Sequence, residues 1–218
     1  MTSYDLLQRE IDSLHEEIIR IGSLSEEQLA SSMESIVTRN SALIKEVIAN
    51  DDIINSKRNS IRDACYKVIV EYRPNEVDLR KILTTQYIAG EFERIGDYAV
   101  RIAKLARTLL ELPERPLGAE LPQLARLARR QLHDIIDALA LKDAQLAREI
   151  AKRDDEVDAQ YHAIYDELVD AMGKEKMSGI YATSLLMVSH NLERISDRVT
   201  NIAEDIVFLV SGERPELG

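Results

Sequence analysis

The sequence carries the motif Glu-Arg-Ile-x-Asp twice, as "ERIGD" and, one hundred residues later, as "ERISD". In the first copy Glu93 and Asp97 are four residues apart, and Glu193 and Asp197 have the same spacing in the second. Residues four apart project from one face of an α-helix, with their Cβ atoms about 6 Å apart. Each copy therefore predicts a helix that presents two carboxylates together, and such a pair can bind a cation.

A second pair of oxygen donors lies upstream of each motif. The segment "NDDIIN" contains Asp51 and Asn55, and "RDDEVD", at an offset of 103 residues, contains Asp154 and Asp158. Helices that pack roughly 8 to 10 Å apart can bring the two pairs of one copy face to face, so that four donors enclose a small volume. The candidate metal ligands are Asp51, Asn55, Glu93, Asp97, Asp154, Asp158, Glu193 and Asp197.

Oxygen donors without cysteine suit hard cations, so we expect iron, manganese, magnesium or calcium, with zinc also compatible. Facing carboxylates repel one another unless a cation neutralises them. The alternative is a solvated helix face, where such repulsion costs only about 0.2–0.5 kcal/mol and neighbours such as Arg94 and Arg194 offset it. The repetition of both pairs at equivalent positions favours the metal site.

The apolar residues around the motifs predict long helices. In the C-terminal segment they recur at intervals of three and four, a heptad-like pattern that the earlier copy repeats one hundred positions before. Glycine, which would punctuate short strands, is absent from Ser23 to Ala89. The C-terminal series is Leu185, Val188, Leu192, Ile195, Val199, Ile202, Ile206 and Leu209.

Several residues predict where these helices begin and end. Pro74 ends one helix, and Asn75 caps the next. Asn40 and its counterpart Asp143 are good N-cap residues ahead of apolar-periodic runs. We expect "YKVIVEY", residues 66–72, to be the buried end of a helix, because no other segment offers it a partner strand.

The chain is therefore predicted to be all-α, with two tandem three-helix bundles related by an internal repeat of about one hundred residues. Residues 1–112 form the first bundle, 113–118 the linker, and 119–218 the second bundle. Pro113, Pro116 and Gly118 in "LPERPLGAELP" mark this linker. We expect six principal helices and an approximate twofold relation between the halves.

Composition limits the possible functions. The net charge of −11 repels nucleic acid and anionic lipid. The single cysteine, Cys65, excludes an intrachain disulfide and a cysteine-rich zinc site. No segment reaches the roughly 18 uncharged apolar residues of a membrane span, and the N-terminus has no apolar signal. We expect a cytoplasmic protein that neither binds nucleic acid nor inserts into a membrane.

The doubled motifs, with "NDDIIN" and "RDDEVD" upstream, resemble those of the PhoU family over almost the whole chain. Members of that family carry Glu/Asp-x-x-x-Asp motifs in pairs, one pair of motifs per bundle, and bind multinuclear iron or zinc clusters. The resemblance implies a non-enzymatic cytoplasmic regulator that keeps the phosphate-starvation response off when phosphate is plentiful. It also implies two partners, the nucleotide-binding subunit of a phosphate ABC transporter and a sensor histidine kinase, and we expect a homodimer.

The first bundle departs from the family pattern at three positions. Asn55 replaces a carboxylate, and Arg58 and Arg62 stand where many relatives have acidic side chains. We therefore expect the second site to bind metal more tightly than the first, because ligand charge tunes affinity for hard cations.

Two other functions share part of the pattern. A metal-free helical scaffold or adaptor is compatible with the same fold. A carboxylate-bridged diiron oxidase or storage protein uses Glu-x-x-His motifs, which this chain lacks. Phosphate-binding loops, G-x-S-x-G and kinase motifs are also missing from the sequence, so we expect no enzymatic activity. The histidines without a Glu three residues earlier are His15, His133, His162 and His190.

Overall fold

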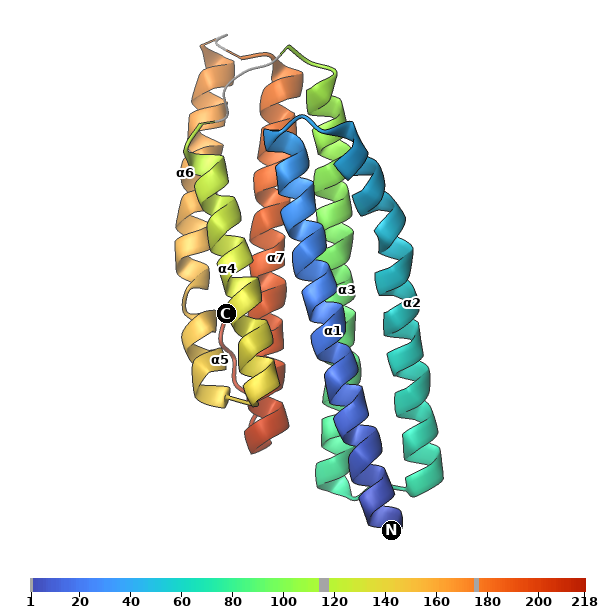
Figure 1. The fold of residues 1–218 in the computed structure, drawn as a ribbon. Helices are drawn as coiled ribbons and strands as arrows, with labels where there is room; N and C mark the ends of the chain where they lie inside the picture. The colour runs from blue at the N-terminus through green and yellow to red at the C-terminus, as the bar shows by residue number, and fades with distance from the viewer. Residues whose placement is uncertain (1, 114–117, 175–176) are drawn as a thin grey trace.

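The computed structural model describes residues 2–113, 118–174 and 177–218. These residues contain seven α-helices and no β-strand (Figure 1), which confirms the all-α fold class. The helices are α1 (Ser3–Val37), α2 (Ser41–Tyr72), α3 (Glu76–Leu110), α4 (Glu120–Leu141), α5 (Ala144–Ala151), α6 (Asp154–Gly173) and α7 (Gly179–Ser211).

Side-chain caps begin the helices where the sequence predicts them. Asn40 accepts a hydrogen bond from the backbone N–H of Ala42 at the start of α2, and Asp143 accepts two from the first turn of α5. Asn75 caps α3 by accepting from the N–H of Asp78. These side chains satisfy amides that have no partner inside the helix.

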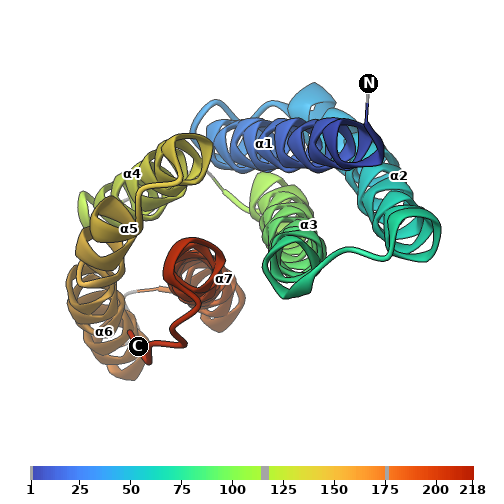
Figure 2. The ribbon, with the colours of Figure 1, turned by 90° about the horizontal axis from the view of Figure 1, so that it is seen from below.

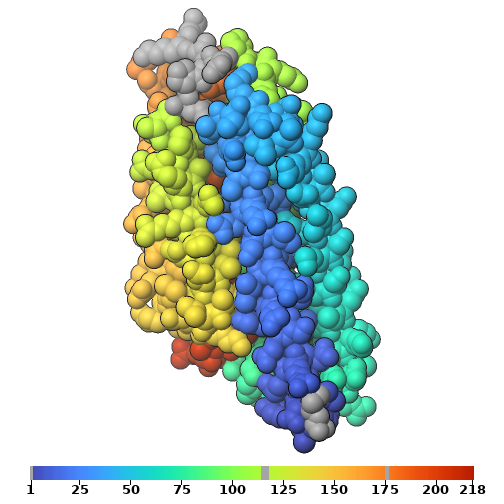
Figure 3. All heavy atoms as spheres, in the orientation of Figure 1, coloured from blue at the N-terminus to red at the C-terminus, as the bar shows by residue number. Residues whose placement is uncertain are grey.

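The helices pack as two units. α1, α2 and α3 contact one another, as do α4 to α7, and the units meet where α1 touches α4 and α3 touches α7. Seen from below (Figure 2), α3 and α7 lie side by side inside an arc formed by the other helices. In the orientation of Figure 1, α1 and α4 lie next to each other on the outer face (Figure 3). The division of the chain at 113–118 stays a prediction, since residues 114–117 lie outside the described residues.

The heptad-like seams form the core. Equivalent positions of the two third helices are fully buried, at Phe92, Ile95 and Ile102 on α3 and at Leu192, Ile195 and Ile202 on α7. The two units pack closely at Gly22 of α1. A Cβ atom there would lie 2.8 Å from Cζ of Phe92 and 3.1 Å from Cγ1 of Ile136 on α4, so this crossing requires glycine.

The structure differs from the predicted six-helix architecture in one detail, because the second helix of the second unit is interrupted. α5 ends at Ala151, and α6 begins at Asp154, whereas α2 runs without a break through the equivalent positions. At the interruption Arg153 forms an ion pair with Asp134 of α4. Three acidic residues then occupy the first turn of α6, where the helix dipole favours negative charge.

The end of α2 is helical, but the prediction that residues 66–72 are buried is wrong. Tyr66 is 71% exposed and Val70 58% exposed, and only Val68 of this segment belongs to the core. The preceding Cys65 is buried, and burial raises the pKa of its thiol to about 12. None of the helices in the described ranges has a stretch that is long and apolar enough to cross a membrane.

Candidate metal centres

In the first unit the candidate ligands lie between α2 and α3. Nδ2 of Asn55 donates a hydrogen bond to Oδ2 of Asp51 at 3.1 Å. Nη2 of Arg58 lies 3.5 Å from Oε1 of Glu93. Burial raises the pKa of Asp51, and the charge of Asp97 on the facing helix raises it further. Side chains of α2 and α3 therefore approach one another here, and the Arg58 guanidinium lies beside Glu93.

In the second unit the candidates lie between α6 and α7. Oγ of Ser196 donates to Oδ1 of Asp154 at 2.6 Å, and Nη1 of Arg194 lies 2.7 Å from Oδ2 of Asp197. Nδ1 of His190 lies 3.3 Å from Oε2 of Glu193. That carboxylate oxygen is buried and accepts no hydrogen bond from the described residues. An acceptor without a donor is costly in such a place, and a cation would satisfy it.

The second set carries more uncompensated negative charge than the first. Burial and the nearby charge of Asp197 raise the pKa of Glu193 to about 7. Burial also raises the pKa of Asp154, although the hydrogen bond from Ser196 opposes this shift. Burial likewise raises the pKa of Asp197, and there the charge of Arg194 opposes the shift. Burial raises the pKa of Glu93 in the first unit, but there the Arg58 charge opposes the shift. A bound cation would relieve the repulsion in the second set most.

The eight candidates do not form a finished coordination site. Among the described residues, no three His, Cys, Asp or Glu side chains converge on a point that could hold a metal ion. Each carboxylate with a close partner points instead toward a neighbour, such as Arg58, Arg194 or Ser196. The donor chemistry fits a hard cation, but binding requires rotation of these side chains. Metal ligation by the eight residues therefore stays a prediction.

Ser196 is a site residue that sequence reasoning missed. Its hydroxyl contacts both Asp154 and the side-chain oxygen of Gln131, which is 2% exposed on α4. A hydroxyl donates only one hydrogen bond, so these two acceptors share one donor. The signal was present, since the only difference between "ERIGD" and "ERISD" is Gly96 against Ser196.

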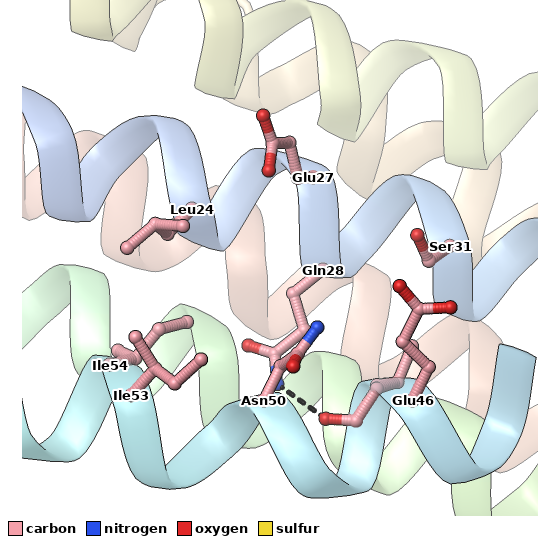
Figure 4. Close-up of a pocket in the computed structure, with 9 residues that line it drawn as sticks. Leu24, Glu27, Gln28, Ser31, Glu46, Asn50, Ile53 and Ile54 are labelled. Atoms are coloured by element: carbon pink, nitrogen blue, oxygen red, sulfur yellow. Dashed lines mark hydrogen bonds between the residues drawn. The ribbon is translucent and has the colours of Figure 1, made fainter.

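In the first unit a serine at Gly96 would be crowded by two side chains. A Cβ atom there would lie 2.9 Å from Oε1 of Gln28 and 3.1 Å from Cδ1 of Ile54. Gln28 points from α1 toward α2, where its amide donates to the carbonyl of Val47 at 2.9 Å (Figure 4). In the second unit Val157 stands in place of Ile54 and lacks the δ-carbon, which leaves room for the serine.

The described helices form an all-α protein built from two helical units, α1 to α3 and α4 to α7. A family model described as PhoU domain matches residues 18–106 and, a second time, residues 121–206. One match falls on each repeat. The chain therefore belongs to the PhoU family.

The similarity to known relatives extends over nearly the whole chain. It is 32% identical over 213 residues to the phosphate-specific transport system accessory protein PhoU homolog of Clostridium acetobutylicum, and the match covers 97% of each protein. It is 31% identical over 204 residues to the accessory protein PhoU of Escherichia coli, covering 94% of this chain and 85% of the relative.

Two crystal structures have the same fold. The phosphate transport system regulatory protein PhoU from Streptococcus pneumoniae superposes with a TM-score of 0.89 at 27% identity, covering 97% of this chain and 100% of that chain. PhoU from Pseudomonas aeruginosa gives 0.90 at 29% identity, covering 94% and 99%.

Proposed function

We propose that this chain is a cytoplasmic, non-enzymatic regulator of phosphate uptake. It keeps the phosphate-starvation response off in excess phosphate by contacting the nucleotide-binding subunit of a phosphate ABC transporter and the cytoplasmic part of a sensor histidine kinase. The supporting observation is the match, over 97% of both chains, to a relative named as an accessory protein of the phosphate-specific transport system. The homodimer is part of the same proposal, and sedimentation equilibrium tests it.

Disruption of the gene tests the regulatory role. In a strain without the protein, transcription of phosphate-responsive genes should stay high in excess phosphate, and a plasmid copy should restore repression. Unchanged transcription in the disrupted strain contradicts the proposal. The purified protein should hydrolyse neither ATP nor phosphate esters, and a robust turnover that Glu193→Ala abolishes would indicate an enzyme instead.

The proposal includes metal ions on the facing carboxylates. Asp154, Asp158, Glu193 and Asp197 would hold the ions of the second unit, and the equivalent first-unit residues would hold weaker ones. Iron or zinc follows from the family resemblance, and manganese or magnesium suits the same oxygen donors. A bound cation would neutralise the facing carboxylates. The support is the buried carboxylate oxygen of Glu193, which accepts no hydrogen bond from the described residues, together with the number of acids around it.

Metal analysis of the purified protein tests this part. Asp197→Asn should lower the total metal content more than Asp97→Asn does, because the second site offers four carboxylates and the first offers three and the neutral amide of Asn55. Mild chelation should remove metal from the first site before the second. Preferential loss from the second site contradicts the charge argument, and absence of metal in wild-type protein purified without chelator favours the metal-free scaffold.

A further inference from the structure

A hollow of about 520 Å³ lies between α3 and α7. We call it the basic groove. Its α3 side carries Arg101, Lys104 and Arg107, all exposed. In the described part of the chain, none of these three cations has a carboxylate within 4.0 Å. This is a local excess of positive charge in a protein whose net charge is −11.

The floor of the basic groove is partly apolar. The guanidinium of Arg101 lies over the ring of Tyr98, 5.0 Å from its centre. Tyr98 also bonds to Arg194 of α7, which is held in turn by the carboxylate of Asp197. Met187, 44% exposed, contributes a flexible apolar surface from α7. The groove therefore combines an apolar floor with a positively charged rim.

The internal repeat supplies a template for what this groove binds. At the equivalent place in the other half, Oε2 of Glu91 accepts hydrogen bonds from Arg198 at 3.3 Å and from Asn201 at 3.2 Å. One α3 carboxylate is thus held by two donors of α7.

In the basic groove the counterpart of this carboxylate is missing. In the repeat, which has an offset of one hundred residues, Asn191 is the counterpart of Glu91, and Arg101 is the counterpart of Asn201. The amide of Asn191 is buried and donates to the carbonyl of Met187. Arg101 is therefore a hydrogen-bond donor like its counterpart Asn201, but the position equivalent to Glu91 provides no carboxylate to accept from it.

We propose that the basic groove binds an acidic segment of a protein partner. A carboxylate of the segment binds at Arg101, a second at Arg107, and an apolar side chain packs on Tyr98 and Met187. The two arginines are six residues apart, roughly 9 Å along the helix axis. Carboxylates about three residues apart on an extended chain match that distance, whereas a single small anion cannot span it. The inference rests on the proposed function only in that such a regulator must contact a partner protein.

Fluorescence anisotropy with the full-length protein tests the inference. The probe is a labelled decapeptide of Glu and Leu, and a peptide with Gln in place of Glu is its control. The double variant Arg101→Glu/Arg107→Glu should weaken binding of the Glu peptide by about tenfold or more, because both pairing cations are reversed. Arg101→Gln/Arg107→Gln should weaken it less, and circular dichroism of each variant checks the fold.

The matched control is Lys67→Glu/Arg126→Glu, which makes the same charge change at exposed positions on α2 and α4. It should leave binding within about twofold of wild type, since distant surface charges are screened by salt. Equal loss in both double variants, no binding by the wild type at low salt, or full competition by millimolar inorganic phosphate overturns the inference. Binding is measured without a transcriptional readout, so its failure is distinguishable from failure of the regulatory role.

Discussion

Replacing Asp205 with asparagine should stabilise the protein at alkaline pH. Asp205 lies half-buried on α7. Its burial, with the charges of Glu91 and Glu204 nearby, raises the pKa of its carboxyl from 3.8 to about 7, and Arg214 offsets only part of this. An asparagine of the same shape carries no charge at any pH, so it removes the cost of ionising this group in the folded protein.

The sign and the size of the effect on folding stability follow from the pKa of Asp205 in the unfolded chain and in the folded protein. Below pH 3.8 the group is protonated in both states and costs nothing, and between 3.8 and about 7 the unfolded chain loses the proton first. Folding stability therefore falls as the pH rises through this window. The difference between these two pKa values corresponds to a loss of folding free energy of roughly 4 kcal/mol as an upper limit. Solvent screening at a half-buried side chain reduces it to about 2 kcal/mol.

Urea unfolding of chelator-treated protein at pH 4.5 and pH 8 measures this effect. Asp205→Asn should exceed wild type in free energy of unfolding by about 2 kcal/mol at pH 8 and by less than about 1 kcal/mol at pH 4.5. Asp63→Asn is the control, because that side chain is 75% exposed and should show no such difference. An Asp205→Asn protein that is equally stable or less stable at pH 8 refutes the reasoning.

Four further substitutions test the packing, a helix cap and a buried hydrogen bond by chemical denaturation. Gly22→Ala should destabilise by about 1–3 kcal/mol, because the new methyl group overlaps the Phe92 ring. Gly90→Ala, with nothing within 4 Å, should be neutral or stabilising by up to about 1 kcal/mol, and a similar loss in both variants would contradict the packing. Asn40→Ala should cost about 1 kcal/mol through the lost cap of α2, and no change would show that water replaces it. Ser196→Ala should cost about 1–2 kcal/mol because a buried acceptor loses its donor, and a neutral effect would argue against that hydrogen bond.

The fold followed closely from local signals in the sequence. The heptad-like series, the absence of glycine over a long stretch, and caps such as Asn40 and Asp143 each depend on a few neighbouring residues. The break between α5 and α6 could not be predicted in this way. It coincides with the ion pair between Arg153 and Asp134 of another helix, and nothing in the local sequence identifies that partner.

The candidate sites were predictable at the level of helix faces but not of side-chain contacts. Spacing of four residues and the repeat offset placed the acids on facing helices. Which group each acid contacts depends on side chains such as Arg58 and Ser196, whose reach is set by packing. The exposure of Tyr66 has a similar cause, because the apolar composition of its segment does not reveal which face has a neighbour.

The most direct test of the account is complementation of the disrupted strain with a second-unit variant. All four carboxylates between α6 and α7 are replaced by amides, and the control carries amides at four exposed acids. At equal protein levels in excess phosphate, the control should restore repression of phosphate-responsive transcription and the second-unit variant should not. Full repression by the second-unit variant would contradict the claim that these carboxylates are the working site. The test replaces Asp154, Asp158, Glu193 and Asp197, and the control replaces Asp12, Glu16, Glu34 and Asp63.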